Sequence, residues 1–145
     1  AIFTTTGNED THVILRGGKQ PNYDAGSVAA AAAELAKAGL PPKLMVDFSH
    51  ANSLKQHERQ RDVCRDVATQ IAAGDESILG VMIESHLVAG RPDAKPGVSL
   101  TYCQSITDAC IGWEDTEEML RELAAAVGQR RAVTATSTLD STLDL

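Results

Sequence analysis

The chain has 145 residues, of which 43% are hydrophobic and 23% are charged, and its formal net charge is −7. This length is enough for one domain with its own core, and the negative charge argues against nucleic acid or an anionic membrane surface as the main partner. No stretch approaches the roughly 18 apolar residues of a membrane span, and no signal segment opens the chain. The three cysteines lack zinc-type spacing, which favours reduced thiols in a cytoplasmic protein.

The first half of the chain predicts two strands with a helix between them. Residues 1–11 are polar and are expected to form a connecting segment, and residues 12–15 form a short apolar run that ends at Gly17-Gly18. Apolar residues then recur at helical spacing over 27–38, and Gly39 and Pro41-Pro42 end this helix. The next apolar run, 44–48, predicts the second strand.

The second half predicts a third strand and two further helices. Asn52 is expected to cap a helix whose buried stripe contains Val63, Val67 and Ile71, and residues 78–83 form the third strand. Residues 88–104 contain Gly90, Pro92, Pro96 and Gly97 and predict a long loop. Asp115 and Glu118 are placed to cap a last helix that runs to Arg131, and residues 132–145 are expected to be a mobile tail.

A residue capable of chemistry follows each of the three apolar runs. These residues are Arg16, His50 and Glu84, and Asp108 follows in the next segment. Functional side chains of β/α enzymes lie where parallel strands end, so this pattern predicts an enzyme site on an α/β fold. Three β/α units are too few to close a barrel of eight strands, so the chain looks like part of an enzyme.

His50, Glu84 and Asp108 together predict a divalent-metal site, since imidazole and carboxylate groups suit Mn²⁺, Fe²⁺, Co²⁺ or Zn²⁺. Each residue also has a simpler structural explanation. A histidine can be a hydrogen-bonded structural residue, a buried strand-end glutamate can pair with an arginine, and an aspartate can cap a turn.

Arg16 is followed by two glycines, Gly17 and Gly18, which allow the backbone to approach a ligand closely. An arginine in this setting predicts a clamp for a phosphate or a carboxylate. The alternative is a salt bridge from Arg16 to a neighbouring strand-end acid.

Four segments of the chain closely resemble the type I 3-deoxy-D-arabino-heptulosonate 7-phosphate (DAHP) synthases. They are ILRGGK at 14–19, MVDFSHAN at 45–52, GVMIESHL at 80–87 and SITDACIGWED at 105–115. The resemblance covers roughly residues 7–131 in order. It implies a TIM barrel that condenses phosphoenolpyruvate with erythrose 4-phosphate in the first step of the shikimate pathway, with one divalent metal.

The resemblance also implies roles for particular residues. His50, Glu84 and Asp108 correspond to three of the family's four metal ligands, and Arg16 corresponds to an arginine that contacts phosphoenolpyruvate. Ser49 and Asn52 lie beside the metal histidine and are expected to line the side of the aldehyde substrate. Arg16 and His50 are therefore the expected catalytic residues.

Several family features are missing from this sequence. The family's metal cysteine lies in a Gly-Pro-Cys-Ser motif, and Cys64, Cys103 and Cys110 are not in such a context. The Lys-Pro-Arg-Thr motif that contributes to both substrates is also absent. We therefore expect residues 1–131 to be the C-terminal part of a barrel, about strands six to eight with their helices. Alone, this part should be inactive, and it should pair with the missing N-terminal half or form a homo-oligomer.

Two other functions remain open at this stage. The chain could be a non-catalytic binding or assembly module that retains weak binding of metal or phosphate. It could also belong to an enzyme of different chemistry on a related metal barrel, such as another aldolase, although the four specific motifs argue against this.

Overall fold

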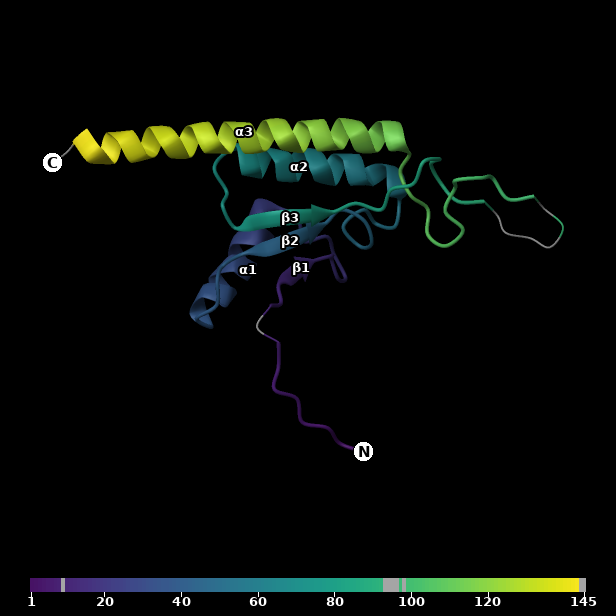
Figure 1. Cartoon of the computed structure of the whole chain (residues 1–145), viewed down its shortest axis with the longest axis horizontal. Helices are drawn as coiled ribbons and strands as arrows, with labels where there is room; N and C mark the ends of the chain where they lie inside the picture. Colours follow the sequence, from purple (N-terminus) through teal and green to yellow (C-terminus); the bar gives the residue numbers. More distant parts are fainter. Residues whose placement is uncertain (9, 93–96, 98, 144–145) are drawn as a thin grey trace.

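The chain folds as a small parallel sheet with helices packed on one face. The computed structural model describes residues 1–8, 10–92, 97 and 99–143 (Figure 1). The strands are β1 (Val13–Leu15), β2 (Leu44–Asp47) and β3 (Ile78–Met82), which are parallel and adjacent in that order. The helices are α1 (Ala25–Lys37), α2 (Gln60–Ala72) and α3 (Trp113–Leu143), and a 3₁₀ turn, η1 (His57–Arg59), precedes α2. The predicted α/β class is confirmed.

The register of the sheet places all three strand ends at one edge. Ile14 pairs with Met45, which pairs with Gly80, and an irregularity lies between Leu44 and Met45. Because the strands are parallel, the residues that follow them meet at the same carboxyl edge. Arg16, the turn after Asp47 and the segment at Glu84 therefore come together in space.

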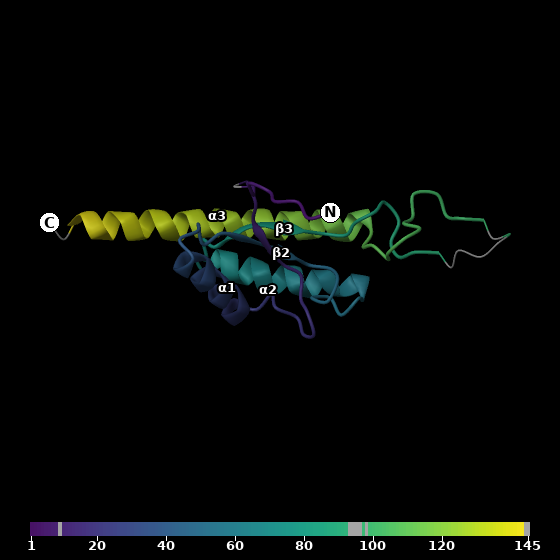
Figure 2. The same cartoon turned by 90° about the horizontal axis from the view of Figure 1, so that it is seen from below.

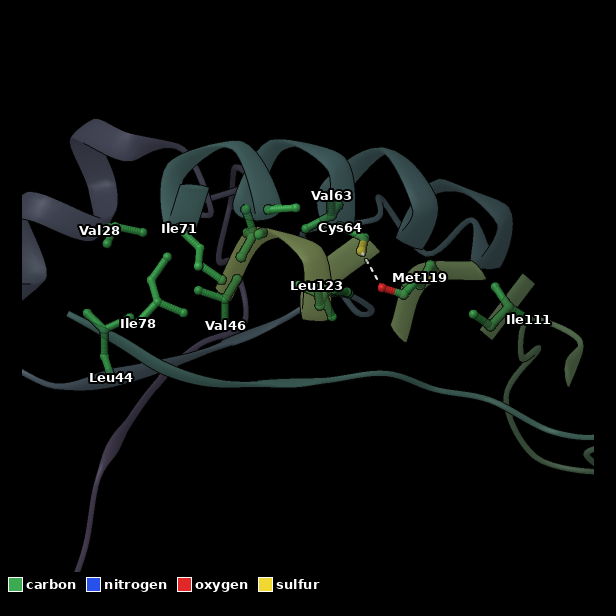
Figure 3. Packing of buried hydrophobic residues seen from close by; sticks show 14 residues of the cluster. Val28, Leu44, Val46, Val63, Cys64, Ile71, Ile78, Ile111, Met119 and Leu123 are labelled. Atoms are coloured by element: carbon green, nitrogen blue, oxygen red, sulfur yellow. Dashed lines mark hydrogen bonds between the residues drawn. The ribbon is translucent and has the colours of Figure 1, made fainter. Parts of the chain in front are cut away.

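The core lies between this sheet and the helices. Figure 3 shows Val46 of β2 facing side chains of α2 such as Ile71, with Met119 and Leu123 of α3 in the same cluster. In Figures 1 and 2, α3 lies along α2, and α1 lies beside α2 on the same side of the sheet. The predicted stripe of α2 is confirmed, because Val63, Val67 and Ile71 are all buried.

The opposite face of the sheet is open. Ile14 is 47% exposed and Leu79 is 54% exposed, whereas their sequence neighbours Leu15 and Ile78 pack into the core. Successive residues of a strand point to opposite faces, so Ile14 and Leu79 belong to the face that no helix covers. This open face is apolar, which is unusual for a sheet in contact with water.

The prediction that a helix begins near Asn52 is wrong, because α2 begins at Gln60 after η1. The side chain of Asn52 binds the carbonyl oxygens of Leu15 and Asp47 rather than the N–H groups of a first helical turn. Leu54 and Lys55 adopt left-handed backbone angles, with φ of 53° and 59°, which a helix does not allow. The chain after β2 is therefore a tight turn.

The last helix also departs from the prediction at both ends. It begins at Trp113, so Asp115 lies inside its first turn and pairs with Arg61 at 2.9 Å instead of capping. It continues to Leu143, past the predicted end at Arg131, so residues 132–143 are helical, and the expectation that residues 132–145 form a mobile tail stays a prediction. This stretch contains neither glycine nor proline to stop a helix. Figure 1 shows that this end of α3 extends beyond the rest of the fold.

The predicted loop at 88–104 contains only isolated bridges, such as Val88 with Gln104, in its described residues. The part of the prediction that concerns residues 93–96 and 98 lies outside the described residues. Among the residues that are described, no helix combines the length and the apolar character that crossing a membrane requires.

Candidate functional site

A cavity of about 400 Å³ opens at the carboxyl edge of the sheet. Its lining contains five of the six residues that the sequence singled out: Arg16, Ser49, His50, Glu84 and Asp108. Lys55, His57 and Ala109 complete the lining. The three parallel strands and the segment before α3 all end beside this cavity. For this reason it brings together residues that are up to 92 positions apart in the sequence.

His50 is held by a carboxylate at the end of β2. Its Nδ1 lies 2.7 Å from Oδ2 of Asp47, which is the last residue of β2 and only 3% exposed. The other oxygen of Asp47, Oδ1, accepts the N–H of Ser49 at 2.8 Å. His50 itself has a φ of 49°, an uncommon value for a residue with a side chain. Such a backbone is typical of functional turns that the surrounding structure holds in place.

Glu84 is fixed through both its side chain and its backbone. Its Oε2 accepts the Ser49 hydroxyl at 2.7 Å, and its Oε1 lies 3.6 Å from Nε2 of His50. The side-chain amide of Gln60, which is fully buried, accepts the Glu84 N–H at 2.8 Å and donates to the Glu84 carbonyl at 3.0 Å. Gln60 therefore bonds both the N–H and the carbonyl of Glu84, as the backbone of a neighbouring strand would. These bonds hold the carboxylate of Glu84 at the cavity.

The chain returns to the cavity at Asp108 along a short parallel contact beyond β3. Ser85 bridges to Ile111, where the Ile111 N–H donates to the Glu84 carbonyl at 3.0 Å. The hydroxyl groups of Ser85 and Thr116 lie 2.6 Å apart and secure the start of α3 to the same segment. Asp108, just before this contact, is exposed and lines the cavity.

Gly17 lets the end of β1 approach the turn after β2. Its φ is 76°, and a Cβ at this position would lie 2.7 Å from Cβ of Ala51 and 2.9 Å from the backbone N of Asn52. The glycine pair was expected to let backbone approach a ligand. Gly17 instead packs against protein backbone, and this close approach leaves the side chain of Arg16 at the cavity.

No carboxylate in the described part of the chain forms a salt bridge with Arg16, whose side chain is exposed. The ion-pair alternative for Arg16 is therefore not realised in this part of the protein. Arg16 thus has no carboxylate partner among the described residues, and it lines a cavity that also contains carboxylates.

Asn52 is the one candidate that does not line the cavity. It is 1% exposed, donates to the carbonyl oxygens of Leu15 and Asp47 at 3.0 and 2.7 Å, and accepts the N–H of Asn22 at 2.8 Å. All of its polar atoms are thus engaged with backbone. In this structure Asn52 joins the ends of β1 and β2, so its expected contact with substrate is not supported.

Sequence reasoning missed four residues of the site. Asp47 ends the apolar run of β2, and its position directly before the candidate residues was a usable signal. Lys55 and His57 also line the cavity, and neither follows a predicted strand directly. Gln60 carries no signal in the sequence, because its role depends on the position of α2 relative to β3.

The cysteines do not contribute to the cavity. Burial raises the pKa of the Cys64 thiol to about 12, and the nearby carboxylate of Glu122 adds to this effect. Burial also raises the pKa of Cys110. Since a cysteine binds metal as the thiolate, neither residue is poised to be a ligand here.

The donor atoms of His50 and Glu84 fit a divalent cation in part. Nε2 and Oε1 face each other at 3.6 Å, which is beyond the range of a hydrogen bond. When Nδ1 donates to Asp47, both facing atoms carry lone pairs, and imidazole nitrogen with carboxylate oxygen suits Mn²⁺, Fe²⁺, Co²⁺ or Zn²⁺. Across the described residues, no three His, Cys, Asp or Glu side chains converge closely enough to hold a metal by themselves. The convergence of Asp108 with this pair therefore stays a prediction.

Comparison with known proteins gives a consistent result. The model of the DAHP synthetase I family matches residues 1–121. The chain is 60% identical over 131 residues to the Phe-sensitive phospho-2-dehydro-3-deoxyheptonate aldolase of Escherichia coli K12, which covers 90% of this chain and 37% of the relative. It is 58% identical over 136 residues to the phospho-2-dehydro-3-deoxyheptonate aldolase of Haemophilus influenzae, which covers 93% of this chain and 38% of the relative.

A solved structure agrees with these sequence matches. The phospho-2-dehydro-3-deoxyheptonate aldolase of Francisella tularensis SCHU S4 superposes with a TM-score of 0.80 at 48% identity, covering 90% of this chain and 38% of that one. The chain thus spans well under half the length of the relatives it matches. With a family model that matches most of its residues and relatives of such high identity, the chain belongs to the DAHP synthetase I family.

Proposed function

We propose that the chain is the C-terminal part of a DAHP synthase, an enzyme that condenses phosphoenolpyruvate with erythrose 4-phosphate at the start of the shikimate pathway. In this proposal β1, β2 and β3 are strands six to eight of a TIM barrel. The high identity to named aldolases and the similar fold of the Francisella enzyme support it. The observation that carries it is that Arg16, His50, Glu84 and Asp108 line one cavity at the carboxyl edge of the sheet.

The residues of this chain would have separate tasks in the reaction. Arg16 would bind the anionic groups of phosphoenolpyruvate and orient its C3 carbon toward the aldehyde. His50, Glu84 and Asp108 would hold the divalent metal together with a cysteine from the rest of the enzyme. When bound, this metal supplies Lewis acidity at the carbonyl of erythrose 4-phosphate. Ser49 would orient the carboxylate of Glu84 through the 2.7 Å hydrogen bond that it donates.

The same proposal implies that the isolated chain has little activity. One metal ligand and most of the phosphate clamp would come from the N-terminal half of the barrel, and that half would also cover the open face of the sheet. We place the complete enzyme in the cytoplasm, as a homo-oligomer.

Reconstitution tests the activity. The 145-residue chain is co-expressed with the N-terminal part of the 60% identical Escherichia coli aldolase, and the purified complex is assayed for condensation of the two substrates. We expect activity in the complex and none in either part alone. A well-folded complex without activity would contradict the proposed function.

Arg16 provides a sharper test in the active complex. Replacing Arg16 with Ala should raise the KM for phosphoenolpyruvate with a smaller effect on erythrose 4-phosphate, and Arg16→Lys should rescue it poorly because lysine lacks the planar two-point grip. Lys19→Ala, which changes an exposed cation outside the cavity, is the matched control. Unchanged use of phosphoenolpyruvate in Arg16→Ala would show that Arg16 does not bind this substrate.

Metal binding can be measured separately by calorimetry with Mn²⁺ or Co²⁺. His50→Gln and Glu84→Gln should each weaken binding by the complex, whereas His12→Gln should not, because His12 lies outside the cavity. Equal affinities in all three variants would remove the metal assignment.

A further inference from the structure

Asp47 is a buried acid whose two oxygens have different partners. Oδ1 accepts the N–H of Ser49 at 2.8 Å, and Oδ2 lies 2.7 Å from Nδ1 of His50. At 3% exposure, Asp47 is shielded from water at the end of β2. Because Oδ1 already accepts a hydrogen bond and a carboxylate oxygen is an acceptor, the short contact at Oδ2 is satisfied when Nδ1 of His50 is the donor.

The rest of the turn holds the imidazole ring in this contact. The carbonyl of His50 accepts the Lys55 N–H at 2.8 Å and the Ser53 hydroxyl at 3.2 Å. These bonds hold the left-handed backbone of His50, and the contact of Nδ1 with Asp47 orients the ring. Nε2 is then directed at Oε1 of Glu84, 3.6 Å away in the cavity.

We propose that Asp47 is a positioning residue that holds His50 as the Nδ1–H tautomer, so that Nε2 offers its lone pair to the cavity. Free imidazole favours the opposite tautomer, with the proton on Nε2. A carboxylate at Nδ1 reverses this preference, as it does for histidines that bind metals through Nε2. The use of Nε2 as a metal ligand rests on the proposed function, whereas the tautomer of His50 does not.

The tautomer can be measured directly in the 145-residue chain. Two-bond ¹⁵N–¹H spectra of ¹⁵N-histidine-labelled protein distinguish the two neutral tautomers, and His50→Gln identifies the signals of His50 among those of the four histidines. The spectra are recorded at increasing pH until the ¹⁵N shifts of His50 no longer change, so that the neutral ring is observed. Magic-angle-spinning spectra of sedimented protein give the same information if the chain self-associates.

In the wild-type chain we expect a protonated Nδ1, a bare Nε2 and an Nδ1 proton shifted downfield by the bond to the carboxylate. In Asp47→Asn the preference for the Nδ1–H tautomer should be lost, because an amide can either accept from Nδ1 or donate to it. The population of the Nε2–H tautomer should therefore increase. Asp62→Asn, which removes an exposed acid on α2, should leave the spectrum of His50 unchanged. A wild-type His50 with its proton on Nε2 would overturn the proposal, and so would an Asp47→Asn variant that folds with an unchanged tautomer. The wild-type spectrum decides the matter if Asp47→Asn does not fold.

A second measurement separates this proposal from the proposed function. In the reconstituted complex, Asp47→Asn should weaken Co²⁺ binding by about 10- to 100-fold, as expected when the partner of a metal-binding histidine is lost. If the wild-type complex binds no metal while His50 is the Nδ1–H tautomer, the metal assignment fails and the role of Asp47 stands. If the complex binds metal but His50 carries its proton on Nε2, the role of Asp47 fails and the metal assignment stands.

Discussion

The carboxyl edge of the sheet and its open face differ in how well their side chains are buried and bonded. At the edge, the polar side chains of Asp47, Ser49, Asn52 and Gln60 are buried and each is hydrogen-bonded to a neighbour. On the open face, Ile14 and Leu79 are about half exposed, and none of the described helices covers them.

This contrast shows which features the chain completes by itself. Local turns and α2 are enough to build the edge, since every bond there comes from within the chain. Among the described residues nothing covers the open face, although apolar side chains on a sheet are stabilised by packing against another layer. The backbone and buried polar groups of the carboxyl edge are therefore satisfied within the described residues, whereas the apolar side chains of the open face are not covered by them.

Self-association of the isolated chain is the largest effect that we expect from the open face. The water-exposed side chains of Ile14 and Leu79, together with the outer edge of β1, which no described strand pairs with, should drive the chain into oligomers or aggregates. Combining Ile14→Lys with Leu79→Lys should shift the population toward the monomer in light scattering and sedimentation velocity.

Leu120→Lys is the control for this experiment, since Leu120 is 48% exposed but lies on α3, away from the sheet. It should leave the oligomers intact. If the wild-type chain is a monodisperse monomer that unfolds cooperatively, the open face needs no partner, and the contrast between edge and face is contradicted.

The largest single-residue effect at the carboxyl edge should come from Gly17→Ala. The substitution combines an unfavourable φ of 76° with a Cβ that would lie 2.7 Å from Ala51, so unfolding free energy should fall by about 3 kcal/mol. Gly18→Ala is a close control, because nothing lies within 4 Å of its added Cβ. Urea denaturation should separate the two variants clearly, and equal stability would show that the edge tolerates a looser approach of β1.

Gln60→Met should have a smaller but still distinct effect on the edge. Methionine has a similar volume, but it leaves the buried N–H of Glu84 without its acceptor, which costs about 2 kcal/mol. Gln56→Met, at an exposed position before η1, should be nearly neutral in the same denaturation experiment. If both variants are equally stable, the two hydrogen bonds between Gln60 and the Glu84 backbone do not hold Glu84 in place.

The same contrast explains how far the sequence could predict the structure. The three strands and the buried stripe of α2 follow from local hydrophobic patterns, and those patterns are confirmed. Arg16, His50 and Glu84 could be found because strand order alone brings strand ends together. Their common position therefore needed no knowledge of side-chain packing.

The errors arise where one residue has two possible local roles. Asn52 can cap a helix or bind the carbonyl oxygens of neighbouring strands, and only the position of β1 decides between them. Asp115 can cap α3, but Arg61 of α2 offers it a charged partner. Residues 132–143 were expected to be a tail because they lack an amphipathic pattern, yet an established helix continues until something stops it.

The smallest effect that we predict concerns Asp24, which caps α1 where the chain leaves the carboxyl edge. Its side chain accepts the Ser27 hydroxyl at 2.6 Å and the Ser27 N–H at 3.0 Å, and these bonds lower the pKa of Asp24 from its usual value of 3.8. Asp24→Ala should reduce the unfolding free energy by about 1 kcal/mol at neutral pH.

A lowered pKa in the folded state means that the ionised cap stabilises the fold above the usual pKa. This stabilisation is lost as the pH falls through the lowered value. The difference in unfolding free energy between wild type and Asp24→Ala should therefore be constant from neutral pH down to about pH 4 and should become smaller below that pH. Glu34→Ala, which removes an exposed acid of the same helix, should show no such pH dependence from a cap. Urea denaturation of the three proteins at a series of pH values measures this directly. A gap that persists unchanged in strong acid would show that the capping bonds do not depend on the charge of Asp24.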